Sequence, residues 1–127
     1  MFIEKLNDRQ QGILLNLGKK LIAADGNIHD KETELLNVLR AQMSPSVQET
    51  VSSNLASDFQ TQESKAALLL EILGLAHADE EYHQDEKSFA SGLAKEVGLD
   101  SDTLADMESW VLRQFALVRE AQQFLEG

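Results

Sequence analysis

Apolar residues recur at three- and four-residue spacings along almost the whole chain, and this periodicity restricts the fold more than any other feature. Over residues 8 to 24, for example, Leu14, Leu17 and Leu21 fall on one face of a helix, because an α-helix advances about 3.6 residues per turn. No stretch alternates with the two-residue period of a half-buried strand. The sequence therefore predicts an all-α protein.

Helix boundaries follow from residues that start or end helices. The predicted helices after the first cover residues 29–42, 44–56, 62–78, 84–97 and 100–124. Ser44 and Pro45 favour a helix start, since serine can cap exposed amides and proline suits the first helical position. Poor helix formers follow them, which weakens that helix. Gly26 and Gly98 are placed to end helices in the left-handed conformation. We expect the strongly apolar helix over 62–78 to be central.

Length and composition set limits on the class of protein. A chain of 127 residues with 43% hydrophobic content has the size of one domain, so we expect a single domain over residues 1–127. The absence of cysteine excludes disulfides, thiolate nucleophiles and sulfur-rich zinc sites. The beginning of the chain does not resemble a secretory signal. The longest apolar stretch, residues 66–78, falls short of the roughly 20 residues that a membrane crossing needs. These features predict a cytoplasmic protein without a transmembrane segment.

The formal net charge of −11 restricts the choice of partners. Such a charge repels the phosphate backbone of nucleic acids, so nucleic acid is not an expected partner. The same charge attracts cations or a basic protein surface. It also keeps a protein soluble without any further function, and charge alone does not separate these alternatives.

Two segments of the chain match each other at the predicted turns. Residues 24–32 (ADGNIHDKE) and 78–86 (ADEEYHQDE) share the pattern A-D-x-x-Φ-H-x-x-E, where Φ is apolar, at an offset of 54 residues. The match extends outward to apolar positions: Leu14 with Leu68, Leu21 with Leu75, Leu35 with Phe89, and Leu39 with Leu93. The chain is therefore expected to contain two related helix-turn-helix units, over about residues 8–42 and 62–97. We expect them to pack about a pseudo-twofold axis, which would place both turns in related environments.

Each of these turns supplies an aspartate, a histidine and a glutamate. The six candidate metal ligands are Asp25, His29, Glu32, Asp79, His83 and Glu86. The aspartates stand at helix C-terminal ends, where negative charge is unfavourable, and a bound divalent cation would compensate for it. The alternative is purely structural. In that case the glutamates complete capping boxes, the aspartates accept hydrogen bonds from turn amides, and the histidines are solvated.

The first turn also imitates part of an EF-hand calcium loop. Asp25, Gly26, Ile28 and Glu32 reproduce the second half of that loop. The first half is missing, because apolar residues stand where the first acidic ligands belong. The sequence therefore argues against the usual calcium cage.

The A-D-G-x-I-x-x-x-E turn after an apolar helix, repeated later in degenerate form, resembles the TerB-like family, to which the tellurite-resistance proteins belong. The resemblance covers nearly the whole chain. It implies an all-helical fold of two related repeats and a cytoplasmic role in metal or oxyanion stress. It also implies protein partners in an assembly near the membrane, and a divalent metal site at Asp25, Glu32, Asp79 and Glu86. The second turn departs from the pattern, since Glu80 stands where glycine is expected.

No sequence motif indicates catalysis. The chain has no nucleophile elbow, phosphate-binding glycine loop or zinc-protease helix, and His77 lies in an apolar helix where a structural role is the default. We therefore expect a non-enzymatic protein. Two functions remain open: a divalent-metal-binding domain, or a protein-interaction module without a specific metal site. Trp110, Phe115 and Phe124 are candidates for a partner surface, with core packing as the alternative.

Overall fold

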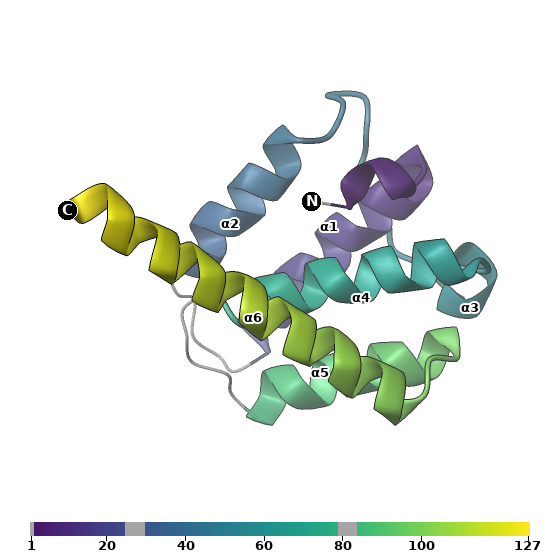
Figure 1. The fold of residues 1–127 in the computed structure, drawn as a ribbon. Helices are drawn as coiled ribbons and strands as arrows, with labels where there is room; N and C mark the ends of the chain where they lie inside the picture. Colours follow the sequence, from purple (N-terminus) through teal and green to yellow (C-terminus); the bar gives the residue numbers. More distant parts are fainter. Residues whose placement is uncertain (1, 25–29, 79–83) are drawn as a thin grey trace.

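Helices make up most of the computed structural model, which describes the backbone of residues 2–24, 30–78 and 84–127, and their side chains except those of 30–32. The elements are η1 (Ile3–Lys5), α1 (Asp8–Ala23), α2 (Asp30–Ala41), α3 (Leu55–Asp58), α4 (Gln62–Ala76), α5 (Gln84–Val97) and α6 (Ser101–Glu126) (Figure 1). No strand occurs among these residues. The prediction of an all-α protein is confirmed.

Helix α4 is the centre of the structure, as the sequence predicted. It contacts α1, α2, α5, α6 and η1, and Figure 1 shows the other long helices arranged around it. Leu68, Leu69, Ile72 and Leu73 on α4 are completely buried. Each fully buried leucine or isoleucine stabilises the fold by about 1.5–3 kcal/mol relative to an exposed one, so the core is built on this helix.

Most helix boundaries agree with those predicted. Helix α5 spans the predicted residues, and Gly98 after it has the left-handed φ of +84°. Asp100 caps α6, because its side chain accepts a hydrogen bond of 2.7 Å from the amide of Thr103. This bond lowers the pKa of Asp100. Four ends differ: α1 and α2 each stop one residue early, α4 stops two residues early at Ala76, and α6 continues past Phe124. The predicted left-handed Gly26 lies outside the described residues.

The matched positions of the two proposed repeats have similar burial. Leu14 and Leu68, Leu21 and Leu75, and Leu39 and Leu93 are buried, whereas Leu35 and Phe89 are both half-buried. Helix α1 contacts α2 as α4 contacts α5, and each unit's first helix also contacts the second helix of the other unit. These contacts agree with two related hairpins, while the pseudo-twofold axis itself remains a prediction.

The helix predicted over residues 44–56 is wrong. The chain turns at Ser44, where the amide of Val47 donates to the Ser44 carbonyl at 3.0 Å, and then runs without regular structure to the four-residue helix α3. The Ser44 hydroxyl lies 2.8 Å from that of Ser46. The serines, threonine and valines here have low helix propensity, and the segment gains tertiary contacts in the extended form. The stabilisation from these contacts is greater than the preference of Ser44 and Pro45 for starting a helix.

The extended segment is bound along helix α1. The amide of Thr50 donates to the carbonyl of Gly12 at 3.0 Å. The carboxylate of Glu49 accepts hydrogen bonds from Lys19 at 2.5 Å and Asn16 at 3.1 Å, and the bond from Lys19 is the main reason that the pKa of Glu49 is lowered. Because Gly12 has no side chain, the two backbones can approach this closely.

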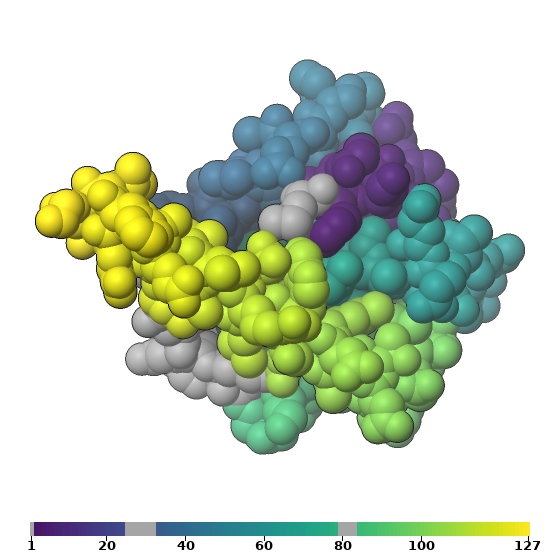
Figure 2. Space-filling model, viewed as in Figure 1, coloured from purple at the N-terminus to yellow at the C-terminus, as the bar shows by residue number. Residues whose placement is uncertain are grey.

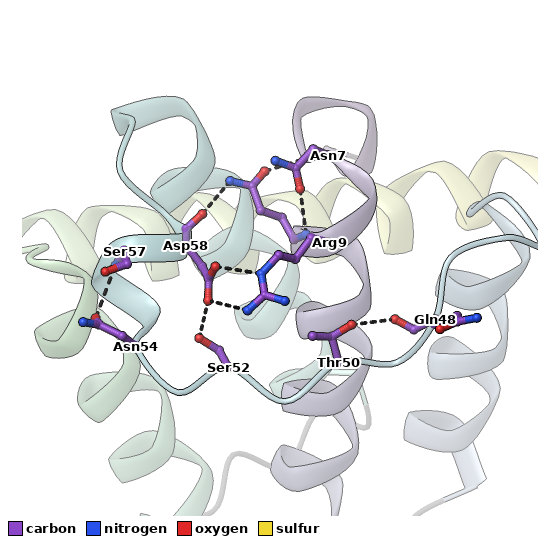
Figure 3. Close-up of polar contacts among 9 residues, drawn as sticks. Asn7, Arg9, Gln48, Thr50, Ser52, Asn54, Ser57 and Asp58 are labelled. Atoms are coloured by element: carbon purple, nitrogen blue, oxygen red, sulfur yellow. Dashed lines mark hydrogen bonds and ion pairs between the residues drawn. The ribbon is translucent and has the colours of Figure 1, made fainter.

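A polar cluster ties the end of this segment to the beginning of α1 (Figure 3). The Asp58 carboxylate accepts a hydrogen bond of 2.9 Å from Nε of Arg9 and one of 2.5 Å from the hydroxyl of Ser52. The side-chain amide of Gln10 donates to the Asp58 carbonyl at 2.7 Å. Arg9 first, and Ser52 second, lower the pKa of Asp58.

The contact at Gly12 predicts the effect of adding one methyl group. In Gly12→Ala, the new Cβ would lie 2.1 Å from the carbonyl oxygen of Gln48. Because that oxygen belongs to the backbone, we expect the free energy of unfolding to fall by about 1–3 kcal/mol, measured by urea denaturation. Gly92→Ala is the matched control, since its Cβ would meet no atom within 4 Å; we expect it to stabilise the protein by about 0.5–1 kcal/mol. Equal effects of the two variants would contradict the close approach.

The cluster around Asp58 predicts a pH dependence of stability. Because the pKa of Asp58 is lower in the folded state, its contribution is present above the unfolded pKa near 4 and is lost as pH falls through the folded pKa. Because Arg9 is exposed, we expect the Arg9–Asp58 pair to make only a small contribution to the free energy of unfolding at pH 7. Asp58→Asn should lose that amount at pH 7 and almost nothing at pH 2, by urea denaturation at both pH values. Asp106→Asn, exposed on α6, controls for removal of one negative charge.

Candidate functional site

Most of the predicted metal ligands cannot be placed. Asp25, His29, Asp79 and His83 lie outside the described residues, and the side chain of Glu32, in the first turn of α2, is also outside them. The structure therefore places one of the six predicted ligands, and the proximity of the two turns stays a prediction.

Glu86, the one predicted ligand that the structure describes, is buried. It lies in the first turn of α5 and is 1% exposed. A carboxylate at this end of a helix is favoured by the helix dipole, but its transfer from water is costly unless other groups compensate. In the predicted capping bond the backbone amide of His83 donates to the Glu86 carboxylate, and His83 lies outside the described residues. The burial of Glu86 is compatible with a structural role and with a ligand role.

The described residues do not form a metal site on their own. Within them, no group of three histidine, aspartate or glutamate side chains is arranged to hold an ion. Glu86 would supply one water-shielded oxygen donor, which suits a divalent cation. All further donors of the predicted site would come from the two turns.

A second candidate site is an apolar groove between α2, α4 and α6. This cavity has a volume of about 270 Å³ and is called the α2–α4–α6 groove below. Its lining residues are Phe2, Leu35, Val38, Leu39, Gln42, Leu70, Glu71, Gly74, Leu75, Trp110, Val111, Gln114, Phe115 and Val118. In Figure 2, α2 and the C-terminal half of α6 lie on the same side of the molecule.

Helical spacing explains how the two walls and the floor arise. On α2 the lining residues Leu35, Val38 and Leu39 stand at positions i, i+3 and i+4, so they share one face. The lining residues of α6 repeat in the same way. Helix α4 forms the floor, and Gly74 lies in it: a Cβ at this position would meet no atom within 4 Å. The fold itself does not need a glycine there, and the missing side chain deepens the groove.

Among the described residues that line the groove, one side chain is charged. The carboxylate of Glu71 accepts a hydrogen bond of 2.7 Å from the backbone amide of Phe2. The ring of Phe2 packs against Trp110 with 5.7 Å between the ring centroids. The beginning of the described chain therefore closes one side of the groove.

The apolar face of α6 continues beyond the groove. Residues 117–126 are all exposed, and Figures 1 and 2 show the end of α6 projecting from the rest of the molecule. Leu125 follows Val118 on the lining face at helical spacing and is 84% exposed, and Phe124 beside it is 87% exposed. Exposed large apolar side chains that adjoin an apolar groove are typical of an interaction surface.

The aromatic residues proposed for a partner surface divide into two groups. Trp110 and Phe115 are half-buried, pack against the core and also line the groove. Each therefore combines core packing with a place on the candidate partner surface, the two alternatives that the sequence left open. Core packing is wrong for Phe124, which is exposed. Sequence reasoning missed Gly74 and the α2 wall, because a glycine inside an apolar helix does not by itself show whether its face stays open; Gly12 on α1 has a similar sequence setting but faces backbone.

His77 occupies a structural position, as expected for a histidine in an apolar segment. It is the C-terminal cap of α4 and is 7% exposed. Its Nε2 lies 3.4 Å from the carboxylate of Glu108 on α6. This contact connects the end of α4 to α6. His77 is not among the residues that line the groove.

Comparisons with known proteins add no relative: no family model, no curated protein and no solved structure matches this chain. The TerB-like resemblance thus stays a prediction from the residues. Among the described helices, none is both long enough and apolar enough to cross a membrane.

Proposed function

We propose that this protein is a non-enzymatic interaction module that binds an α-helix of a partner protein in the α2–α4–α6 groove. The observation that carries this proposal is the continuity of the groove with the exposed apolar face at the end of α6. The groove exposes Val38 on one wall and Val118 on the other, with half or more of each side chain in contact with solvent. Burial of this surface would favour association.

The shape of the groove favours a helix as its occupant. Its walls are two helices that present lining residues at three- and four-residue spacings. A partner helix with apolar residues at the same spacings could lie between them, which is a common mode of peptide recognition. Gly74 in the floor would let the backbone of that helix approach α4 closely. A small-molecule pocket would instead enclose most of its ligand, and here α6 extends the surface well past the cavity.

Filling the groove from its floor tests this proposal. The probe is a synthetic 18-residue helical peptide with leucines at i, i+3, i+4 and i+7 and equal numbers of lysine and glutamate. Trp110, the chain's only tryptophan, lines the groove, so we expect saturable changes of its emission with a dissociation constant below about 100 μM. Gly74→Met should weaken binding at least tenfold, because the new side chain would occupy the groove.

Gly92→Met is the matched control, since position 92 also has open space around its Cβ but lies on α5. It should leave peptide binding unchanged. Both variants should unfold at or above the wild-type urea midpoint, because methionine is a better helix former than glycine. An absence of binding, or equal binding to both variants, would rule out the groove as the helix site.

A second candidate function is divalent metal binding by the duplicated turns. The observation that favours it is Glu86, an almost fully buried carboxylate directly after the second turn. The TerB-like resemblance supports the same function and a role in cytoplasmic stress response. Asp25, Asp79 and the other turn residues would supply the remaining donors, and the bound ion would offset the negative charge at the ends of the preceding helices.

Titration of the metal-free protein tests this second function. Calcium, magnesium, manganese and zinc are added separately while backbone amide signals are followed, with Asp25→Asn/Asp79→Asn in parallel. We expect saturable shifts confined to both turns and to the start of α5, and their loss in the double variant. Weak shifts spread over carboxylates throughout the protein would instead assign the turns to helix capping.

A further inference from the structure

We infer that the helix bound in the α2–α4–α6 groove is the exposed end of α6, residues 117–126, from a second copy of this chain. Two copies would then form a symmetric dimer whose α6 helices lie antiparallel. This inference rests on the proposed function, because it identifies the helix that occupies the groove. Three features of α6 support it: its apolar pattern, its position beside the groove, and the order of charges along it.

Helix α6 carries an apolar seam with a seven-residue repeat. The seam consists of two rows of apolar residues at seven-residue intervals: Leu104, Val111, Val118 and Leu125, and, one position earlier, Trp110, Leu117 and Phe124. A seven-residue repeat is the pattern with which two helices pack side by side along their length. The first half of the seam packs on the core of its own chain. In the second half Leu117, Val118, Phe124 and Leu125 are each more than half exposed, so the seam continues beyond the contacts that its own described chain provides.

The groove and the end of α6 lie next to each other and have matching patterns. Val118 belongs to both, because it lines the groove and also begins the exposed part of the seam. Val118, Ala121 and Leu125 stand at positions i, i+3 and i+7, a spacing with which an amphipathic helix occupies an apolar groove. A second copy supplies both surfaces at once. Its α6 end would fill this groove while its own groove receives the end of this α6, so that a two-fold interface makes each contact twice.

The order of charges along α6 favours an antiparallel pair. Residues 113–119 include two arginines and no acidic residue, and residues 120–126 include two glutamates and no basic residue. In an antiparallel pair centred between these two segments, each positive segment lies beside the negative segment of the other copy, whereas a parallel pair would place like charges together. Arg113 alone keeps the first segment positive, so this complementarity does not depend on a contact of Arg119.

The same charges reduce the repulsion between two acidic chains. The two arginines and two glutamates of residues 113–126 sum to zero, so the facing helices themselves carry no excess charge. The net charge of −11 of each copy therefore comes from the rest of the chain. Repulsion between those charges acts over longer distances, where salt screens it.

The seam also sets the register of the pair. When two antiparallel helices pack along such a repeat, Val118 of one copy faces Ala121 of the other, and Gln114 faces Leu125. This register overlaps the exposed parts of both helices. A shift by one repeat toward the beginning of α6 would require Val111, which is buried in the core of its own chain.

Sedimentation equilibrium of the full chain in 0.2 M salt tests the dimer. We expect a monomer–dimer equilibrium with a dissociation constant below about 50 μM. Leu125→Asn should weaken the dimer at least tenfold, because it places a polar side chain on the seam. Leu112→Asn is the matched control, since Leu112 is also an exposed leucine of α6 but lies on the opposite face. It should leave the dimer unchanged, and both variants should keep the helical circular dichroism of the wild type.

Filling the groove tests whether the second copy binds there. Gly74→Met should weaken the dimer at least tenfold, because the new side chain would occupy the space that the end of the other α6 needs. Gly92→Met, which fills open space on α5, should not change it.

Cysteine cross-linking tests the orientation, and the chain has no cysteine of its own. Chains with Gln114→Cys and chains with Leu125→Cys are mixed and oxidised. We expect a disulfide-linked dimer from the mixture and almost none from either variant alone. Positions 114 and 125 face each other in the antiparallel pair, whereas like positions lie about 16 Å apart, too far for a disulfide.

The outcomes distinguish this inference from the proposed function. A protein that is monomeric but binds the synthetic helical peptide, and loses that binding in Gly74→Met, would overturn the inference and leave the groove as a helix site. A monomer that binds no peptide would overturn both. A dimer that survives Leu125→Asn or Gly74→Met, or that cross-links like positions in place of the mixed pair, would also overturn the inference, because the two copies would then associate through another surface or in another orientation.

Discussion

Burial of helix α4 is the constraint on which the rest of the structure depends. Its residues are apolar nearly all round, with Leu68, Leu69, Ile72 and Leu73 inaccessible to solvent, so a stable fold must cover it on several sides. Helices α1 and α5 contact it together with α2, α6 and η1. Each of these helices is amphipathic and cannot bury its own apolar stripe alone, so α4 and its neighbours stabilise one another.

The same constraint explains why a groove exists. Helices α2 and α6 both pack on α4, and the space between them is lined by Gly74 and Leu75 of α4. A large side chain in place of Gly74 would fill part of this space, and Phe2 closes another side. Helix α6 is also longer than the core that it covers. Its last turns therefore carry apolar residues with no part of the described chain packed over them.

Much of the fold could be predicted from periodicity, whereas the groove could not. The bounds of α5 were predicted to the residue from the residues at its ends, and α4 was recognised as central from its apolar composition. Both features are local, so the sequence alone shows them. The segment after Ser44 was predicted wrongly because its conformation depends on Gly12, more than thirty residues away, which lets the chain lie on α1. The groove likewise depends on how three separate helices pack. Spacing identified the apolar residues without showing which faces stay exposed.

Gly12 and Gly74 illustrate the difference between what the local sequence predicts and what the tertiary structure determines. Both are glycines inside apolar helices, and the sequence around them gives no reason to treat them differently. A Cβ at position 12 would collide with backbone, whereas one at position 74 would meet nothing. The first glycine is required by contacts within the chain. The second is not required by the described contacts, although glycine weakens a helix by about 0.5–1 kcal/mol relative to alanine; the space that it leaves is open to the α2–α4–α6 groove.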